Sequence, residues 1–387
     1  MPAAPRIYLD NAATSFPKPE SVYTAVDYVQ RRVGAAEGRS STRTALQVHG
    51  VLERCRQRVA RLLGAESPER IVFTFNATDS LNLALYGLLR PGDHVVTSMI
   101  EHNSVLRPLR HLTDRGVTVT YVPADAEGRI NPAAVEQALQ NKTRLVAMIH
   151  ASNVTGTIQP IDRVGEIARS AGAFFLVDAA QTAGHLPIDL ARSPVDLLAC
   201  AGHKGLLGPL GTGILYVRTG LEEHLQSIRQ GGTGTNSQDD HQPNMLPDKY
   251  EAGNHNVPGL FGLEAGLAWL EERTVAEVCR HERQLTAQLL DALAGLPRLR
   301  IYGPKSIEDR VGVVSVSIEG MDPQELAAVL DDSFGIETRA GLHCAPGAHR
   351  CLGTFAGGGT LRLSPGAFTT EAEIAAAASA LRAVASA

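Results

Sequence analysis

The sequence predicts an α/β fold, in which a mostly parallel sheet is covered by helices and is followed by a smaller α+β unit. Through the first two-thirds of the chain, short runs of apolar residues alternate with helical patterns. Continuous apolar strands separated by helices are typical of parallel sheets, because such strands are buried on both faces. From about Gly259 the pattern changes to long helices, and two further strands follow.

The expected strands are short runs rich in Val, Ile, Leu, Phe and Thr. In chain order, those of the first part are RIVFTF (70–75), DHVVTSM (93–99), VTVTYVPA (117–124), TRLVAMIHAS (143–152), AFFLVDAAQ (173–181), VDLLACAG (195–202) and GTGILYVR (211–218). Apolar residues at helical spacing predict helices between them, for example over 79–89 and 132–141. In the second part we expect long helices over 259–293, a helix over 322–334, a terminal helix over 371–387, and strands over 311–318 and 360–364.

The chain is also too long for one core. Its 387 residues exceed the roughly 250–300 at which single cores stop growing. We therefore predict a large domain over residues 16–259 and a small C-terminal domain over 260–387, with residues 1–15 packing against the small one.

Composition and charge exclude several classes of protein. An apolar content of 44% with 20% charged residues is ordinary for a soluble globular protein. The net charge of −5, with scattered Lys and Arg, gives no reason to expect a nucleic acid or an anionic membrane as partner. We find neither a secretory signal pattern nor a stretch near the ~20 apolar residues of a membrane span. Five cysteines, mostly far apart, make a poor disulfide framework, so we expect a cytoplasmic protein.

Polar residues follow several of the predicted strands. Thr78 lies where a helix begins, and free N–H groups at such a start suit a phosphate, although simple helix capping explains Thr78 equally well. Asp178 and Gln181 come at the end of a presumed central strand, where open α/β sheets bind ligands and where a carboxylate can also cap a helix. Lys204 lies among glycines, in a Schiff-base site or in an exposed turn. His102 can stack on a planar ring or be structural.

The order of these residues is more specific than any one of them. A phosphate site, a stacking histidine, an asparagine loop (ASNVTGT), a carboxylate for a pyridinium nitrogen and a Schiff-base lysine are the parts that pyridoxal phosphate requires. Each follows a separate strand. The sequence therefore predicts a pyridoxal phosphate site at this edge of the sheet.

The stretch GLHCAPGAHRC (341–351) places two cysteines and two histidines within eleven residues. Four such side chains are enough ligands for zinc, but the adjacent His343 and Cys344 do not have the usual Cys-x-x-Cys spacing. A disulfide between Cys344 and Cys351 is sterically possible and is disfavoured in a reducing cytoplasm. The spacing argues against a metal here, but it does not decide between a disulfide and a loop that carries one reactive thiol.

The residues above give the chain a resemblance to the cysteine desulfurases of the class V aminotransferase family. The resemblance runs from IYLDNAATSFPKP (7–19) to GTLRLSPGAFTTEAEI (359–374), and AAEGRSS (35–41) is similar to the EGxSS stretch of one subgroup. It implies a fold-type I pyridoxal phosphate enzyme. It also implies a homodimer with the active site at the subunit interface.

The resemblance assigns a role to each cofactor-binding residue. Lys204 would hold the cofactor as a Schiff base and move the proton of the substrate Cα. Asp178 would pair with the pyridinium nitrogen, Gln181 would contact the ring hydroxyl, and His102 would stack over the ring. The phosphate would be held by Ala77, Thr78 and His203, with Asn254 reaching the partner subunit's phosphate.

The resemblance also assigns the substrate side of the site. Asn153 and Arg362 would bind the substrate carboxylate, for which a guanidinium is well shaped. Cys344 matches the nucleophilic cysteine, which would take the sulfur of L-cysteine as a persulfide, release L-alanine and deliver the sulfur to an acceptor protein. Within this reading, His343 is a candidate for deprotonating the thiol. The glycines and proline around Cys344 predict a mobile loop.

The chain departs from the family pattern at Ala201, at Asn254 and in SPGAFTT (364–370), which differs from the usual ending after the substrate arginine, and other functions stay open. Ala201 stands where relatives commonly have Ser or Thr, and Asn254 stands where they commonly have Thr. The alternatives are a selenocysteine lyase, another C–S lyase of a biosynthetic pathway, and a non-catalytic scaffold of the same fold. Cys344 separates the enzymes, because β-elimination without a persulfide does not need this cysteine and deselenation depends on it less. The complete set of residues around Lys204 argues against a scaffold.

Overall fold

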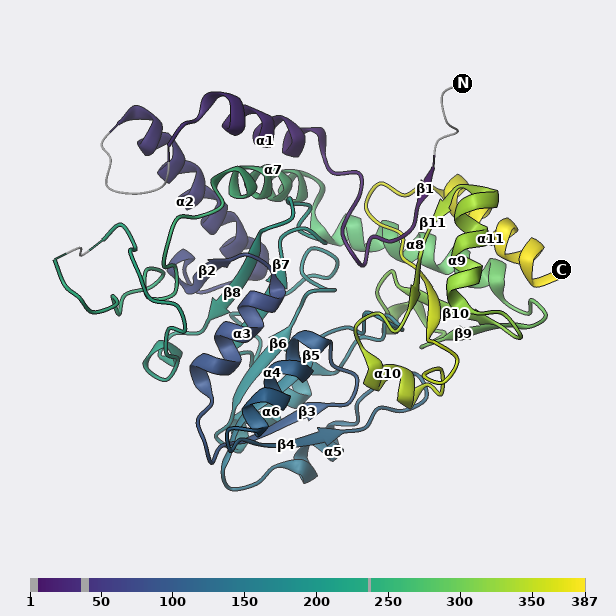
Figure 1. Cartoon of the computed structure of the whole chain (residues 1–387), viewed down its shortest axis with the longest axis horizontal. Helices are drawn as coiled ribbons and strands as arrows, with labels where there is room; N and C mark the ends of the chain where they lie inside the picture. The colour runs from purple at the N-terminus through teal and green to yellow at the C-terminus, as the bar shows by residue number, and fades with distance from the viewer. Residues whose placement is uncertain (1–5, 36–41, 236–237, 387) are drawn as a thin grey trace.

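The computed structural model of the chain describes residues 6–35, 42–235 and 238–386 (Figure 1). The predicted EGxSS-like stretch lies outside the described residues except for Ala35. The described residues form a large, mostly parallel sheet covered by helices and a smaller sheet built from the C-terminal part of the chain. The predicted α/β fold is therefore confirmed.

The large sheet has seven strands in the order β2-β8-β7-β6-β5-β3-β4. They are β2 (Ile71–Thr74), β3 (His94–Ser98), β4 (Thr118–Val122), β5 (Thr143–Ile149), β6 (Phe174–Asp178), β7 (Leu197–Ala201) and β8 (Gly213–Val217). The strands from β7 to β4 are parallel, whereas β8 is antiparallel to both of its neighbours. Each strand expected in the first part of the sequence is present.

Both faces of this sheet are covered, because successive strand residues point to opposite sides. In β2, Ile71 and Phe73 belong to one core cluster and Val72 belongs to the other. The first cluster is shared with α2 (Arg43–Leu63), α5 (Pro132–Ala138), α6 (Ile161–Ser170) and α7 (Val257–Arg273), and the second with α3 (Ala77–Leu88) and α4 (Asn103–Thr113). Helix α1 (Glu20–Arg32) packs on α7.

The C-terminal part forms a four-stranded antiparallel sheet with its own core (Figure 1). Its strand order is β12 (Arg339–Gly341), β13 (Thr360–Leu363), β10 (Val314–Ile318) and β9 (Leu299–Tyr302). The accompanying helices are α8 (Val275–Leu293), α9 (Pro323–Phe334), α10 (Pro346–Cys351) and α11 (Glu371–Ser386). Short 3₁₀ helices are η1 (Pro68–Arg70), η2 (Leu221–Glu223) and η3 (Ile307–Asp309).

The start of the described chain joins this smaller sheet region to the large one. Strand β1 (Ile7–Tyr8) pairs in parallel with β11 (Ile336–Glu337), and Asp10 forms an isolated bridge with Ser364 just after β13. The division at residue 260 stays a prediction. Helix α7 spans that point, and its buried residues share a core with the large sheet.

A buried ion pair fastens α2 to the segment before α7. Arg56 Nη1 and Nη2 donate to Glu251 Oε1 and Oε2 at 2.8 and 3.0 Å, and Glu251 Oε1 also accepts the Phe73 N–H at 2.6 Å. Burial alone would raise the pKa of Glu251, but Arg56 and His255 outweigh it and lower the pKa to about 2. The carboxylate is therefore charged and depends on its partners.

Replacing Arg56 with methionine should destabilise the fold by about 3–5 kcal/mol at pH 7, because the Glu251 carboxylate stays buried without its bidentate cation. Denaturant unfolding measures the loss, and the double variant Arg56→Met/Glu251→Gln should recover most of it. The pKa of Glu251 is lowered from 4.5, so the stabilisation is fully present above that pH and is lost as the pH falls toward 2. Equal stability of Arg56→Met and wild type would contradict this role.

Candidate active site

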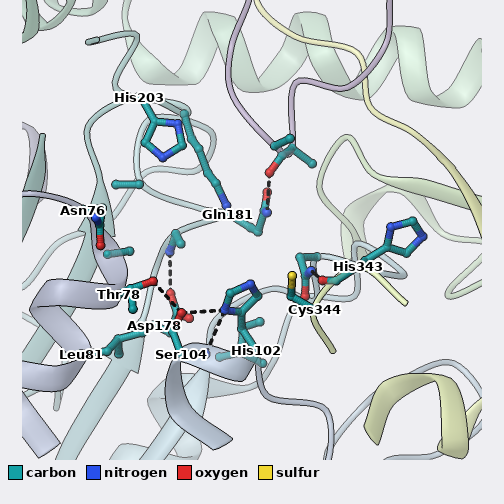
Figure 2. A pocket seen from close by; sticks show the side chains of 18 of the residues that line it. Asn76, Thr78, Leu81, His102, Ser104, Asp178, Gln181, His203, His343 and Cys344 are labelled. Atoms are coloured by element: carbon teal, nitrogen blue, oxygen red, sulfur yellow. Dashed lines mark hydrogen bonds between the residues drawn. The ribbon is translucent and has the colours of Figure 1, made fainter. Parts of the chain in front are cut away.

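A cavity of about 220 Å³ lies between the large sheet and the smaller one. All predicted site residues except Asn254 line it: Ala77, Thr78, His102, Asn153, Asp178, Gln181, His203, Lys204, Cys344 and Arg362 (Figure 2). Segments far apart in the sequence therefore meet at one place.

The topology of the large sheet explains one wall of the cavity. His102 follows β3, Asn153 follows β5, Asp178 ends β6, and Lys204 follows β7. These four strands are parallel neighbours in the sheet, so their C-terminal ends lie along one edge. The opposite wall comes from the smaller sheet, where Arg362 lies on β13.

Lys204 and Asp178 form the electrostatic centre of the cavity. Burial lowers the pKa of Lys204 to about 8 from 10.5, and Asp178 opposes this shift. Burial raises the pKa of Asp178, while the Ala180 N–H, which donates to Asp178 Oδ1 at 3.0 Å, and Lys204 act against burial. A lysine with a pKa near 8 is partly neutral at physiological pH and can act as a nucleophile or as a base.

His102 is the N-cap of α4, and its ring contacts the hydroxyl of Ser104, which in turn contacts the hydroxyl of Thr78. Its Nδ1 accepts the Ser104 N–H at 3.1 Å and lies 2.8 Å from Ser104 Oγ. Ser104 Oγ in turn lies 2.7 Å from Thr78 Oγ1. Burial lowers the pKa of His102 to about 4, and the nearby Lys204 and Arg339 add to this effect. The imidazole is therefore neutral at physiological pH.

The N-terminal segment forms the floor of the cavity. Gln181 Nε2 donates to Ala12 O at 3.0 Å, and Ser15 N donates to His203 O at 3.0 Å. Burial lowers the pKa of His203 to about 4. His203 Nδ1 is buried and has no hydrogen-bond partner within the described residues, so it is available to a ligand.

Arg362 is fixed in place before any ligand is bound. Its Nη1 donates to Asn153 O at 3.1 Å, and its Nη2 donates to Asp10 Oδ1 at 2.5 Å. The amide of Asn153 donates to His343 O at 2.6 Å. Arg362 Nε and Asn153 Oδ1 are buried without a partner in the described part of the chain. This pair of side chains therefore offers one donor and one acceptor to a ligand.

The Cys344 segment is packed against neighbouring segments, and the mobility that its glycines and proline predict stays a prediction. Cys344 O accepts the Asn103 N–H at 2.8 Å, and a Cβ on Gly347 would lie 1.8 Å from Met99 O. Cys344 has a φ of +60°, in the left-handed region that costs a non-glycine residue on the order of 1–2 kcal/mol. The sulfur is therefore held at the cavity by a constrained backbone.

His343 does not face the thiol of Cys344, contrary to the predicted assistance. Its Nε2 lies 3.1 Å from both Thr360 O and Thr360 Oγ1, and Figure 2 shows the ring turned away from the Cys344 sulfur. Burial lowers the pKa of His343 to about 2, with Arg362 acting in the same direction, so the ring is a weak base. The sulfur is instead contacted by Arg339, whose Nη2 lies 3.8 Å from Cys344 Sγ.

One predicted cofactor residue, Asn254, does not line this cavity. Asn254 lies beside Arg229 and His255 at a separate cavity of this chain, so its predicted role toward a partner subunit stays a prediction.

Among the residues that the structure describes, no group of three or more His, Cys, Asp or Glu side chains is arranged to hold a metal ion. None of the described helices is long and apolar enough to cross a membrane.

Sequence reasoning missed three residues of the site. Arg339 contacts the Cys344 sulfur, Ser104 bridges His102 and Thr78, and Asp10 pairs with Arg362. Asp10 belongs to IYLDNAATSFPKP, which was quoted for the resemblance, and Arg339 comes two residues before GLHCAPGAHRC; each is a charged residue that precedes a run of uncharged ones. These isolated charges could have indicated Arg339 and Asp10, whereas no feature of the sequence indicated Ser104.

Known proteins are similar to this chain over nearly its whole length. The family described as Aminotransferase class-V matches residues 7–376. A curated protein of Methanothermobacter thermautotrophicus named "Probable cysteine desulfurase" is 37% identical over 373 residues, which cover 95% of this chain and 92% of that protein. A Haloferax volcanii protein named "Cysteine desulfurase" is 32% identical over 91% of this chain and 84% of its own length.

A solved structure extends the similarity to three dimensions. The apo structure of cysteine desulfurase from Thermococcus onnurineus superposes with a TM-score of 0.92 and 34% identity, and the match covers 98% of this chain and 95% of that one. The sequence matches and the superposition span both sheets and both walls of the cavity. The chain therefore belongs to the class-V aminotransferase family.

Proposed function

We propose that the protein is a pyridoxal phosphate-dependent cysteine desulfurase. The observation that carries this proposal is that a lysine with a lowered pKa, a buried carboxylate and a thiol line one cavity, as Lys204, Asp178 and Cys344. The names of the relatives support the same activity. A transaminase of this fold has no use for a thiol held at the cavity.

The cavity fits the cofactor. His203 Nδ1 is buried without a partner among the described residues, and Ala77 and Thr78 form the first turn of α3, where unpaired N–H groups suit a phosphate. Asp178 is buried where a protonated ring nitrogen would stabilise its charge. His102 is neutral and lines the cavity, so its ring can stack on another. Ala201 also lines the cavity and offers a methyl group instead of a hydroxyl.

The protein residues divide the chemistry between them. Bound pyridoxal phosphate supplies an electron sink that lowers the cost of removing the proton from the substrate Cα. Lys204 would hold the cofactor, and its free amine would take that proton, because an amine with a pKa near 8 can both accept and return it. Asp178 would keep the ring nitrogen protonated.

Arg362 and Asn153 set the orientation of the substrate. The unpaired Arg362 Nε–H and the fixed guanidinium suit a carboxylate, and the ion pair with Asp10 holds the guanidinium at the cavity. The unpaired Asn153 Oδ1 can accept a hydrogen bond from a bound ligand. An α-amino acid held by its carboxylate here would direct its side chain toward the Cys344 wall. L-cysteine is the proposed substrate, and selenocysteine would bind in the same way.

Cys344 performs the sulfur transfer. Its thiolate attacks the substrate sulfur, so that an S–S bond forms and the Cβ–S bond breaks. The electron pair of the broken bond stays with the substrate carbon, which is protonated and leaves as alanine. Arg339 Nη2 lies 3.8 Å from Cys344 Sγ, so a cation adjoins the reacting sulfur. A thiol or an acceptor protein then reduces the persulfide and carries the sulfur away.

We also propose a homodimer, in which Asn254 reaches the partner subunit's phosphate, and a cytoplasmic location. The cavity beside Asn254 opens separately from the candidate active site, as expected for a residue that serves another subunit. All five cysteines are free, which suits a reducing compartment.

The products formed from L-cysteine test this function. Purified protein with pyridoxal phosphate and dithiothreitol should release alanine and sulfide in equal amounts. Elimination would instead give pyruvate, ammonia and sulfide, and would favour a C–S lyase. Selenocysteine in place of cysteine measures the preference for selenium. If the protein turned over neither cysteine nor selenocysteine, this result would contradict the proposed activity.

A further inference from the structure

Three side chains at the cavity form a continuous hydrogen-bonded chain. Thr78, at the start of α3, lies 2.7 Å from the Ser104 hydroxyl, and Ser104 lies in the first turn of α4. The Ser104 hydroxyl is 2.8 Å from His102 Nδ1, which also accepts the Ser104 N–H at 3.1 Å. Figure 2 shows the three side chains following one another from the Thr78 end of the cavity to the His102 ring.

The backbone N–H of Ser104 determines which group is the donor in each of these hydrogen bonds. A backbone N–H can only donate, so His102 Nδ1 must be an acceptor without a proton. A neutral imidazole then carries its proton on Nε2. The Ser104 hydroxyl must therefore donate to Nδ1, which leaves its oxygen free to accept the Thr78 proton. The order of donation is Thr78 to Ser104 to His102.

We propose that Ser104 is a positioning residue that fixes His102 as the Nε2–H tautomer and orients that proton into the cavity. This inference adds a residue to the proposed function. The tautomer itself does not depend on that function, whereas the expected effect on turnover rests on it. His102 then meets a ligand as a hydrogen-bond donor, suited to delivering a proton rather than to removing one. A phosphate that draws the Thr78 proton to itself leaves the bond from Ser104 to His102 intact.

The charges around His102 act in the same direction. Lys204, Arg339, Arg107 and Arg362 are the charged groups that influence its titration, and they come from the loop after β7, from β12, from α4 and from β13. All four are cations and oppose a second proton on the ring. The neighbouring Glu101 is buried, and its carboxyl bonds to Ser98 and to the Ile149 N–H instead. The neutral tautomer is thus maintained by charge and by hydrogen bonds together.

The tautomer can be read directly by NMR. The holoenzyme is labelled with ¹⁵N-histidine, and the His102 signals are assigned by their loss in His102→Gln. At pH 7.5 we expect Nδ1 to give the shift of an unprotonated ring nitrogen and Nε2 that of a protonated one. A proton on Nδ1 would overturn the proposal. This measurement does not depend on turnover, so it stands even if the proposed desulfurase activity fails.

The role of the Ser104 hydroxyl is tested by Ser104→Ala. Loss of one donor should move the Nδ1 resonance downfield and raise the pH at which His102 titrates, because a donor to Nδ1 stabilises the neutral ring. For alanine formation we expect kcat to fall about tenfold while KM stays within about twofold, as for an impaired proton transfer. Ser104→Thr keeps the hydroxyl and should restore all three readouts.

The matched control is Thr113→Ala. Thr113 is an exposed residue of α4 whose hydroxyl donates to Leu109 O, so this variant removes a hydroxyl from the same helix without touching His102. It should behave as wild type. If Ser104→Ala leaves the resonance, the titration and kcat as in wild type, Ser104 has no positioning role.

Discussion

Replacing Lys204 with alanine is expected to lower the turnover of L-cysteine at least about 10³-fold and to abolish the visible absorption of the bound cofactor. Both effects have one cause, because the same amine would hold the cofactor and move the Cα proton. Alanine formation and an absorption spectrum of the purified protein measure them.

Lys204→Arg is the matched control for charge. It keeps a cation beside Asp178, but a guanidinium neither forms a Schiff base nor gives up its proton near neutral pH. We expect it to be as inactive as Lys204→Ala. If Lys204→Arg keeps more than about a tenth of the wild-type rate, the role of Lys204 as a base is wrong and the lysine only supplies charge.

The lowered pKa of Lys204 also predicts an effect on stability. In the apoprotein at pH 7, a buried amine must carry a charge that its surroundings disfavour, so Lys204→Met should be more stable than wild type. The pKa is about 8 in the folded protein and 10.5 for the free side chain. The difference should therefore be largest below pH 8 and should shrink as the pH rises toward 10.5. Denaturant unfolding of the two apoproteins at pH 7 and pH 10 checks the sign.

The site residues that could be predicted from the sequence are those that follow strands. His102, Asp178 and Lys204 each come directly after a buried apolar run, and the parallel sheet brings the ends of such runs together. The same reasoning predicted the cofactor, because the residue types and their order match its chemical parts. The strands themselves were predictable because each is a short apolar run bounded by glycine, proline or polar residues.

The remaining features depend on contacts between distant segments. Asp10 and Arg362 are 352 residues apart, and no pattern predicts that they pair. The Cys344 segment, whose local sequence is typical of a mobile loop, is packed so closely that a Cβ on Gly347 would meet Met99 O. His343 adjoins Cys344 in the chain, yet a positive φ at both residues turns its ring to Thr360. Adjacency in sequence was a poor guide to adjacency in space.

Cys344→Ala is expected to abolish alanine release from L-cysteine, with a fall of at least about 10³-fold, while the absorption of the bound cofactor is retained. The cofactor residues lie mainly on the large-sheet wall of the cavity, and the thiol lies on the other. Removing the sulfur should therefore leave cofactor binding unchanged and remove only the acceptor of the substrate sulfur. Mass spectrometry of the wild type after brief exposure to cysteine should show one added sulfur on the peptide that contains Cys344.

Cys351→Ala is the control for this prediction. Cys351 lies at the end of α10, seven residues from Cys344, and is partly buried against the core of the large sheet. This variant should keep near wild-type activity and should still acquire the added sulfur. Equal alanine release by Cys344→Ala and wild type would exclude a persulfide on Cys344. Loss of alanine release in Cys351→Ala alone would then identify Cys351 as the nucleophile, whereas pyruvate in place of alanine would indicate elimination.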